Sequence, residues 1–108
     1  LISTEQFAAM KPGAFLVNVS RGPVVDTIAL IEAARSGKLG GAVLDVFDEE
    51  PLPPDSPLWD APNVVITPHI AGVSKRSMDS LVDLFVTNLG RYLKGQELYN
   101  LIDPEQGY

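Results

Sequence analysis

The chain has 108 residues, of which 45% are hydrophobic and 20% charged, and this suits one globular domain or a piece of one. Its formal net charge of −6, without a basic stripe, argues against nucleic acids and anionic membranes as partners. Because the chain has no cysteine, disulfides, thiolate metal sites and cysteine nucleophiles are excluded, no metal site is predicted, and a reducing, cytoplasmic location is expected.

The N-terminal stretch LISTEQFAAMKPG has neither an initiator Met nor the basic start and apolar core of a signal peptide. No apolar run reaches the roughly 20 residues that a membrane-spanning helix needs. The sequence opens directly into a helical pattern, so we expect it to be an internal cut from a longer chain.

The first two predicted elements are a short helix and a strand. Ser3 and Gln6 have the spacing of a capping box, which predicts a helix that ends near Met10. After the turn formers Lys11-Pro12-Gly13, the apolar run Ala14–Val19 has the length of a strand.

The middle of the chain predicts a helix, a strand and a loop. Asp26 is a good N-cap for the amphipathic stretch Thr27–Ser36, and Gly37 is well placed to end that helix. Ala42–Phe47 is predicted as the second strand. The segment 51–62 is too rich in proline for regular structure.

The last third predicts a strand followed by a long helix. Asn63–Thr67 is the third strand, and Ser74 can cap a helix that Gly95 ends. Leu98–Ile102 is expected to be extended. The helix is predicted from apolar residues at helical spacing, which are Leu81, Leu84, Phe85, Leu89, Tyr92 and Leu93.

Apolar strands that alternate with helices favour an α/β fold, with a parallel sheet covered by helices on each side. Ligands in such sheets bind outside the carboxyl ends of the strands. This rule selects three places, which are Ser20-Arg21-Gly22, the segment after Asp45, and Pro68-His69.

Each strand end carries a side chain with a possible chemical role. The guanidinium of Arg21 could bind a carboxylate through two parallel hydrogen bonds, although on position alone a solvated surface arginine is the more common case. His69, the only histidine, could transfer protons near neutral pH, or it could be a partly buried residue bonded to the backbone.

Two carboxylates complete the set of candidates. Glu50 closes an acidic run that could be merely solvated, but beside His69 it would favour the imidazolium and orient the ring. Asp45 is predicted inside an apolar strand, where a carboxylate is costly, so we expect it to point into a ligand cleft or to cap a helix. An Arg, a carboxylate and a His at successive strand ends would suit carbonyl reduction with a hydride-donating cofactor.

Three ordered motifs carry a family resemblance over nearly the whole chain, and they are Asn18–Gly22 (NVSRG) with Val25-Asp26, Leu44–Phe47 (LDVF) with Glu50-Pro51-Leu52, and Thr67–Gly72 (TPHIAG). The sequence closely resembles the D-isomer-specific 2-hydroxyacid dehydrogenases. That family of oxidoreductases includes glyoxylate/hydroxypyruvate reductases and phosphoglycerate dehydrogenases.

The resemblance implies a role for each candidate. Arg21 would bind the substrate carboxylate, His69 would be the general acid/base and Glu50 its partner, whereas Glu49 is one position off the family pattern. The substrate would be a 2-keto or D-2-hydroxy acid, and the cofactor NAD or NADP. The residues expected along the cofactor, around its nicotinamide end, are Val19, Ser20, Arg21, Asp45, His69, Ile70, Ala71 and Gly72.

The chain also lacks part of the family pattern. No G-x-G-x-x-G motif is present, so we expect the second half of a Rossmann-type parallel sheet. Residues 1–94 would be the C-terminal part of the NAD(P)-binding domain, and residues 95–108 a tail that returns toward the substrate domain. The resemblance further implies a homodimer. Two alternatives stay open, which are a dinucleotide-sensing corepressor or dimerisation module, and a non-catalytic segment that pairs through its sheet edge.

Overall fold

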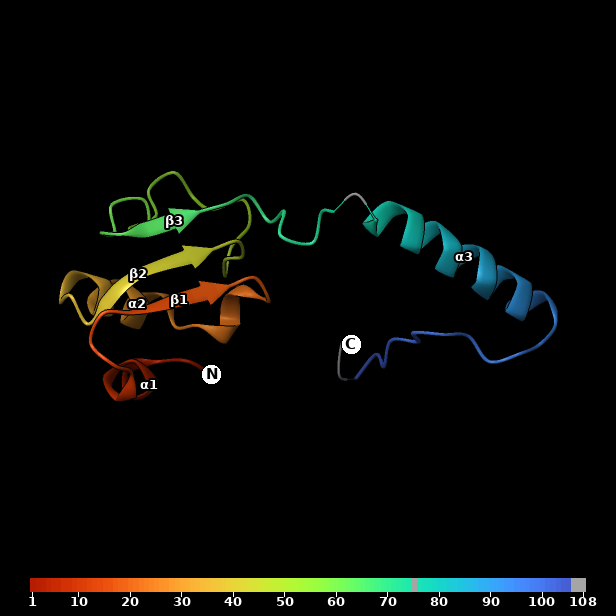
Figure 1. Ribbon diagram of the computed structural model, residues 1–108, viewed down its shortest axis with the longest axis horizontal. Coiled ribbons are helices and arrows are strands. Elements are labelled where there is room, and N and C mark those ends of the chain that lie inside the picture. The colour runs from red at the N-terminus through yellow and green to blue at the C-terminus, as the bar shows by residue number, and fades with distance from the viewer. Residues whose placement is uncertain (75, 106–108) are drawn as a thin grey trace. The chain divides into compact units, whose positions relative to one another are not determined.

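The computed structural model describes residues 1–74 and 76–105. The chain forms two compact units, Leu1–Ala71 and Gly72–Tyr108 (Figure 1). The sheet and the helices packed on it belong to the first unit, and one long helix belongs to the second. All three predicted strand ends therefore lie in the first unit.

The first unit is built on a parallel sheet with the order β1 (Ala14–Asn18), β2 (Leu39–Leu44), β3 (Val64–Ile66). Both strand pairs are parallel, which confirms the predicted α/β fold. In the register, Asn18 pairs with Leu44, and Leu44 pairs with Ile66. All three strands thus end at the same level along the sheet.

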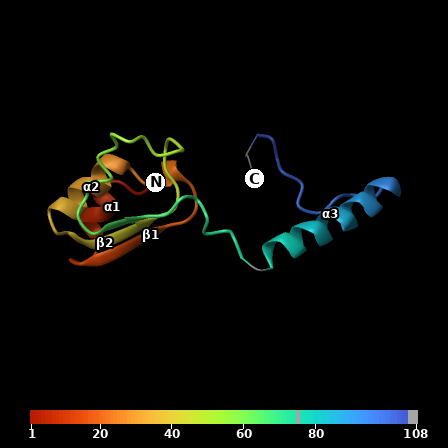
Figure 2. The ribbon, with the colours of Figure 1, turned by 90° about the horizontal axis from the view of Figure 1, so that it is seen from above.

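Helices α1 (Thr4–Ala9) and α2 (Thr27–Arg35) pack on one face of this sheet (Figure 2). The predicted capping box at Ser3 is confirmed, since the Ser3 amide donates to the Gln6 side chain at 2.9 Å. Asp26 caps α2 as predicted, because one of its oxygens accepts two amides of the first turn at 3.1 Å. Local signals in the sequence therefore determine where both helices begin.

The core lies between α2 and the covered face of the sheet. Leu30 of α2 and Leu39 of β2 are almost completely buried, and Gly37, with a φ of +73°, lets the chain turn between these elements. On the opposite face, the side chains of Phe15, Val17 and Val65 are exposed. The β2–β3 connection is a proline-rich loop instead of a helix, so no element within the first unit covers this face.

Strand β2 differs from the prediction at both ends. It begins at Leu39 instead of Ala42 and ends at Leu44, so Asp45 follows the strand and does not lie inside it. The early start was hidden by Gly40 and Gly41, because glycine weakens a strand pattern. The structure requires glycine here, since a Cβ on Gly40 would lie 2.6 Å from the Gly13 carbonyl oxygen and one on Gly41 would lie 2.9 Å from the Asn63 carbonyl oxygen.

The second unit is dominated by α3 (Ser77–Leu93). The helix begins at Ser77, three residues after Ser74, which was predicted to cap it. The Ser74 hydroxyl still accepts the Ser77 amide at 3.1 Å. Gly95 ends the helix with a φ of +64°, as predicted. The segment 98–102, which was expected to be extended, bends at residues 99–100, and the Asn88 side chain binds both the amide and the carbonyl of Tyr99.

Among the described residues, no helix combines the length and the apolar character that crossing a membrane requires.

Replacing Leu30 by Ala is expected to lower the free energy of unfolding by about 2–5 kcal/mol, because the truncation leaves a cavity in the core. Leu30 is 1% exposed, whereas Ile28 on the same helix is 71% exposed. Ile28→Ala is therefore the matched control, with an expected change below about 0.5 kcal/mol. Chemical denaturation followed by circular dichroism measures both, and equal losses would contradict this description of the core.

Asp26 links stability to pH. Hydrogen bonds from the Ala29 amide, the Ser3 hydroxyl and the Ile28 amide hold the pKa of the Asp26 carboxyl below its ordinary 3.8. A lowered pKa in the folded state means that the stabilisation is complete above pH 3.8 and is lost as the pH falls through the folded pKa. Asp26→Asn, which caps without titrating, should therefore flatten the acid limb of a denaturation profile. Asp55→Asn in the exposed loop is the charge-matched control, and an acid limb unchanged in Asp26→Asn would refute the link.

Candidate active site

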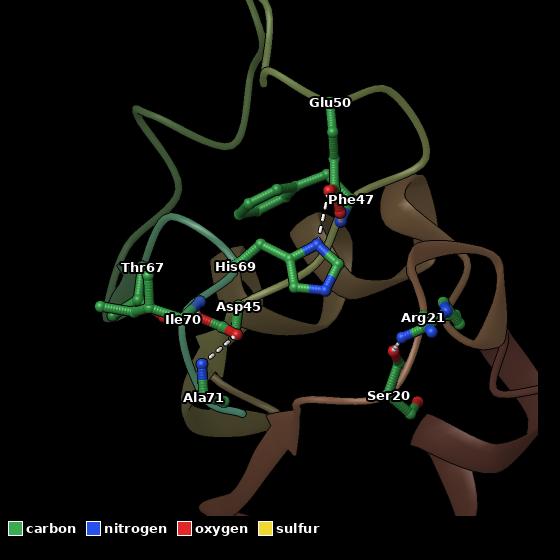
Figure 3. Close-up of polar contacts among 9 residues, drawn as sticks. All are labelled: Ser20, Arg21, Asp45, Phe47, Glu50, Thr67, His69, Ile70 and Ala71. Carbon is green, nitrogen blue, oxygen red and sulfur yellow. Dashed lines mark hydrogen bonds and ion pairs between the residues drawn. The ribbon is translucent and has the colours of Figure 1, made fainter. Parts of the chain in front are cut away.

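The loops that follow the three strands meet at one edge of the sheet (Figure 3). Ser20 and Arg21 follow β1, the segment Asp45–Glu50 follows β2, and the segment Thr67–Ala71 follows β3. The three places selected from the sequence are thus brought together by the parallel pairing.

The Arg21 loop is shaped by a buried asparagine at the end of β1. The Asn18 side chain donates to the Arg21 carbonyl at 3.0 Å and accepts the Ser20 amide and hydroxyl at 3.1 and 2.8 Å. Arg21 itself is exposed, and its Nη1 donates to the Ser20 carbonyl at 2.7 Å (Figure 3). Because a guanidinium has five N–H donors, most of its fork is available to a ligand.

The Arg21 loop also touches the backbone of the Glu50 loop. A Cβ built on the buried Gly22 would lie 2.1 Å from the carbonyl carbon and oxygen of Phe47. Only a residue without a side chain permits this approach. Gly22 therefore fixes the distance between the loop that carries Arg21 and the loop that carries Glu50.

Glu50 and His69 form a direct pair. His69 Nδ1 lies 2.7 Å from Glu50 Oε2, and the Phe47 amide donates to Glu50 Oε1 at 2.9 Å. The hydrogen bond from His69 holds the pKa of the Glu50 carboxyl below its usual 4.5, and the Phe47 amide and the charge of Arg21 act in the same direction. The side chains of His69 and Glu50 are 49% and 35% exposed, so a ligand can reach them.

The pair determines which ring nitrogen can act on a ligand. An ionised carboxylate only accepts hydrogen bonds, so the Nδ1 of His69 must carry a proton. Nε2 points away from Glu50, toward the side of the site where Ser20 and Arg21 lie (Figure 3). Nε2 is therefore the atom that can give a proton to a ligand or take one from it.

His69 has an unusual backbone, with a φ of +53°. For a residue other than glycine, such a conformation costs about 1–3 kcal/mol and persists only where the surroundings hold it. The surroundings here include the carboxylate of Asp45, which accepts hydrogen bonds from Thr67, Ile70 and Ala71. The Thr67 hydroxyl contributes most, and the two amides add to it, in holding the pKa of the Asp45 carboxyl below its usual value.

The prediction for Asp45 is thus wrong in its details. Asp45 caps no helix, and its oxygens are directed at the turn after β3 and not into an open cleft. The reason is that the residue after β2 lies level with the chain that leaves β3, whose amides need acceptors.

A cavity of about 670 Å³ adjoins the Glu50–His69 pair. Its walls are mainly apolar, and they include Phe47, Leu52, Trp59 and Ile66. These residues were not predicted as site residues, since none carries a group with obvious chemistry. Trp59, an aromatic residue in the proline-rich loop between Glu50 and His69, is the signal that the sequence offered.

The candidates differ in how closely the structure gathers them. Glu50 and His69 are in contact, and Arg21 follows the neighbouring strand end. Val19 and Ser20 follow β1 directly, and Ile70 and Ala71 follow His69, whereas Gly72 belongs to the second unit. Three supporting residues were missed as site residues, which are Asn18, Gly22 and Thr67.

Comparison with known proteins identifies the family. The model of the D-isomer specific 2-hydroxyacid dehydrogenase NAD binding domain matches residues 1–71. The chain belongs to this family. The resemblance that the motifs suggested is therefore confirmed, and so is an NAD-binding domain of the Rossmann type as its fold.

Relatives in this dehydrogenase family are much longer than the chain. The glyoxylate reductase of Thermofilum pendens is 45% identical over 97% of the chain, which covers 31% of that relative. The glyoxylate/hydroxypyruvate reductase B of Pectobacterium carotovorum is 48% identical over 97% of the chain and 33% of the relative. The chain thus spans about a third of the length of these proteins.

Solved structures agree with this assignment. A D-isomer specific 2-hydroxyacid dehydrogenase from Xanthobacter autotrophicus, in complex with NADPH and MES, is 44% identical, with a TM-score of 0.86 over 100% of the chain and 44% of its own. An NADPH-dependent glyoxylate/hydroxypyruvate reductase from Sinorhizobium meliloti, in complex with NADP and sulfate, is 35% identical, with a TM-score of 0.84 over 99% of the chain and 35% of its own.

Gly22→Ala should lower the free energy of unfolding by about 1–3 kcal/mol, because the added methyl group must push the Phe47 backbone away. The matched control is Gly90→Ala in α3, where a Cβ meets no heavy atom within 4 Å. Denaturation curves of the two variants test the contact. Unchanged stability in Gly22→Ala would show that the two loops do not constrain each other.

Proposed function

We propose that this chain supplies the acid–base and substrate-binding groups of an NAD(P)-dependent dehydrogenase that interconverts 2-keto acids and D-2-hydroxy acids. The observation that carries the proposal is the 2.7 Å contact between Glu50 and His69, beside the exposed guanidinium of Arg21. The reductase names of its relatives support the same reaction. Since the chain spans about a third of the length of these relatives, we propose this reaction for a longer chain that contains these residues.

In the proposed reaction, Arg21 binds the carboxylate of the substrate through its fork and holds the 2-keto group near His69. During reduction, His69 Nε2 donates a proton to the carbonyl oxygen, and Glu50 stabilises and orients the imidazolium. During oxidation, Nε2 takes the proton from the hydroxyl group. The two loops approach each other closely at Gly22. This approach keeps the Arg21 guanidinium, which binds the carboxylate, near the Glu50–His69 pair, which transfers the proton.

The strand ends fit the nicotinamide end of a dinucleotide. Val19 offers an apolar side chain that is 55% exposed at the end of β1, next to Ser20 and Arg21. Ile70 and Ala71 offer the opposite wall after His69, Asp45 acts through the turn that it holds, and Gly72 is assigned from the family resemblance alone. NAD or NADP, when bound there, supplies the hydride for the 2-keto carbon.

The relatives suggest a small substrate, because their names include glyoxylate and hydroxypyruvate. We also infer that residues 1–94 complete the NAD(P)-binding domain and that residues 95–108 lead back toward a substrate domain. A homodimer, a cytoplasmic location, and the absence of nucleic acids and membranes among the partners belong to the same proposal. No observation favours the corepressor or dimerisation alternative.

The test follows NADH and NADPH absorbance in the longer chain with glyoxylate, hydroxypyruvate, pyruvate and larger 2-keto acids. His69→Ala should lower kcat by about 10²–10⁴-fold, because proton transfer is lost. Arg21→Ala should mainly raise KM, by about tenfold or more, because a charge-assisted hydrogen bond is lost.

Adjacent glutamates provide the matched control. Glu50→Gln removes the carboxylate that contacts His69 and should lower kcat, whereas Glu49→Gln makes the same change in charge one residue away and should not. Turnover that survives His69→Ala, or equal effects of the two glutamine variants, would refute the proposed mechanism. Binding of dinucleotide without any turnover would favour a sensing role.

A further inference from the structure

Asp45 is one of the most deeply buried polar residues described, with 2% of its surface exposed. Its Oδ1 accepts the Thr67 hydroxyl and the Ile70 amide, the latter at 3.0 Å, and its Oδ2 accepts the Ala71 amide at 2.7 Å. Figure 3 shows the carboxylate beside these donors. A buried carboxylate with this set of donors is costly to disturb.

The donors lie on both sides of His69 in the sequence. Thr67 precedes His69 by two residues, and Ile70 and Ala71 follow it directly. Between them His69 adopts the left-handed conformation, with its amide bonded to the Thr67 carbonyl at 3.1 Å. Because L side chains rarely adopt this conformation, it needs a partner that fixes the residues before and after it.

The segment that carries Asp45 also carries Glu50. Asp45 binds the backbone around His69, and Glu50 binds its ring, so a single stretch of six residues, 45–50, holds the histidine at two points. The Phe47 amide, in the middle of this stretch, fixes Glu50. Without the attachment at Asp45, the turn could relax to an ordinary conformation and carry the ring away from Glu50.

We propose that Asp45 is a positioning residue, which holds the left-handed turn at His69 so that the imidazole Nδ1 meets Glu50. Its importance for catalysis rests on the proposed function, but the contact that it controls exists in this chain itself. Asp45 acts through the turn, and its hydrogen bonds go to Thr67, Ile70 and Ala71 instead of the imidazole. The lowered pKa of its carboxyl is consistent with this role, since it keeps Asp45 an anionic acceptor.

The single histidine of the chain makes the test direct, because NMR then shows one imidazole. In the 108-residue chain, the Nδ1 proton of His69 should show a cross-peak to the Glu50 side chain. Asp45→Asn should abolish this cross-peak and speed up amide exchange at Ile70 and Ala71 by about tenfold or more. Circular dichroism checks that the sheet is retained.

Asp48→Asn is the matched control. Asp48 also accepts a threonine hydroxyl, from Thr27 of α2 at 2.9 Å, but it is exposed, and its partner lies outside the His69 turn. Asp48→Asn makes the same change in charge and in hydrogen-bonding capacity as Asp45→Asn, three residues further along the chain. The control should leave the cross-peak and the exchange rates unchanged.

A second pair of variants covers the case in which Asp45→Asn does not fold. Thr67→Val removes the hydroxyl that Asp45 accepts and should weaken the His69–Glu50 cross-peak, while Thr67→Ser keeps the hydroxyl and should restore it. The proposal would be overturned if the His69–Glu50 cross-peak in folded Asp45→Asn, or in Thr67→Val, were as strong as in the unsubstituted chain. Asp45 would then be a purely structural residue.

These measurements need neither cofactor nor substrate, so they stand apart from the proposed function. In the longer chain, Asp45→Asn should lower kcat by about tenfold or more with a smaller effect on KM, because the proton-transferring group is misplaced. A longer chain without dehydrogenase activity would refute the proposed function, and the NMR result would still decide the role of Asp45.

Discussion

Parallel pairing of the three strands in register is the constraint on which the site depends. Because Asn18, Leu44 and Ile66 lie side by side, the chain leaves every strand at the same edge and in the same direction. The strand register alone then brings together three residues that are far apart in the sequence, which are Arg21, Glu50 and His69. No contact between their side chains is needed to bring them to the same end of the sheet. The chemistry is therefore a consequence of the sheet, and the loops only refine it.

The refinement is done by polar groups at the strand ends. Asn18 at the end of β1 and Asp45 after β2 use their side chains on the backbone of the loops that carry Arg21 and His69. Buried polar groups must be paired, and here the pairing is directed at the backbone of Arg21 and of the residues next to Arg21 and His69. A short loop with such an anchor can hold an exposed side chain in place without being buried itself.

Much of this could be predicted from the sequence, because caps, turns and apolar runs are local signals. The capping box at Ser3, the N-cap at Asp26 and the glycines that end two helices were all found this way. The start of β2 was missed because its two glycines are required by backbone carbonyls of Gly13 and Asn63, which are distant from them in the sequence. The role of Asp45 was missed for the same reason, since its partners lie 22 to 26 residues further along the chain.

The close approach at Gly22 has a consequence for how such a site can change. The Phe47 backbone occupies the space where a side chain would stand, so position 22 can take a larger residue only if the two loops move apart. Any larger residue at position 22 therefore changes the spacing between the arginine loop and the glutamate loop, although glycine itself carries no reactive group. Transplanting this chemistry onto another sheet would require both loops to be moved together, with their glycine.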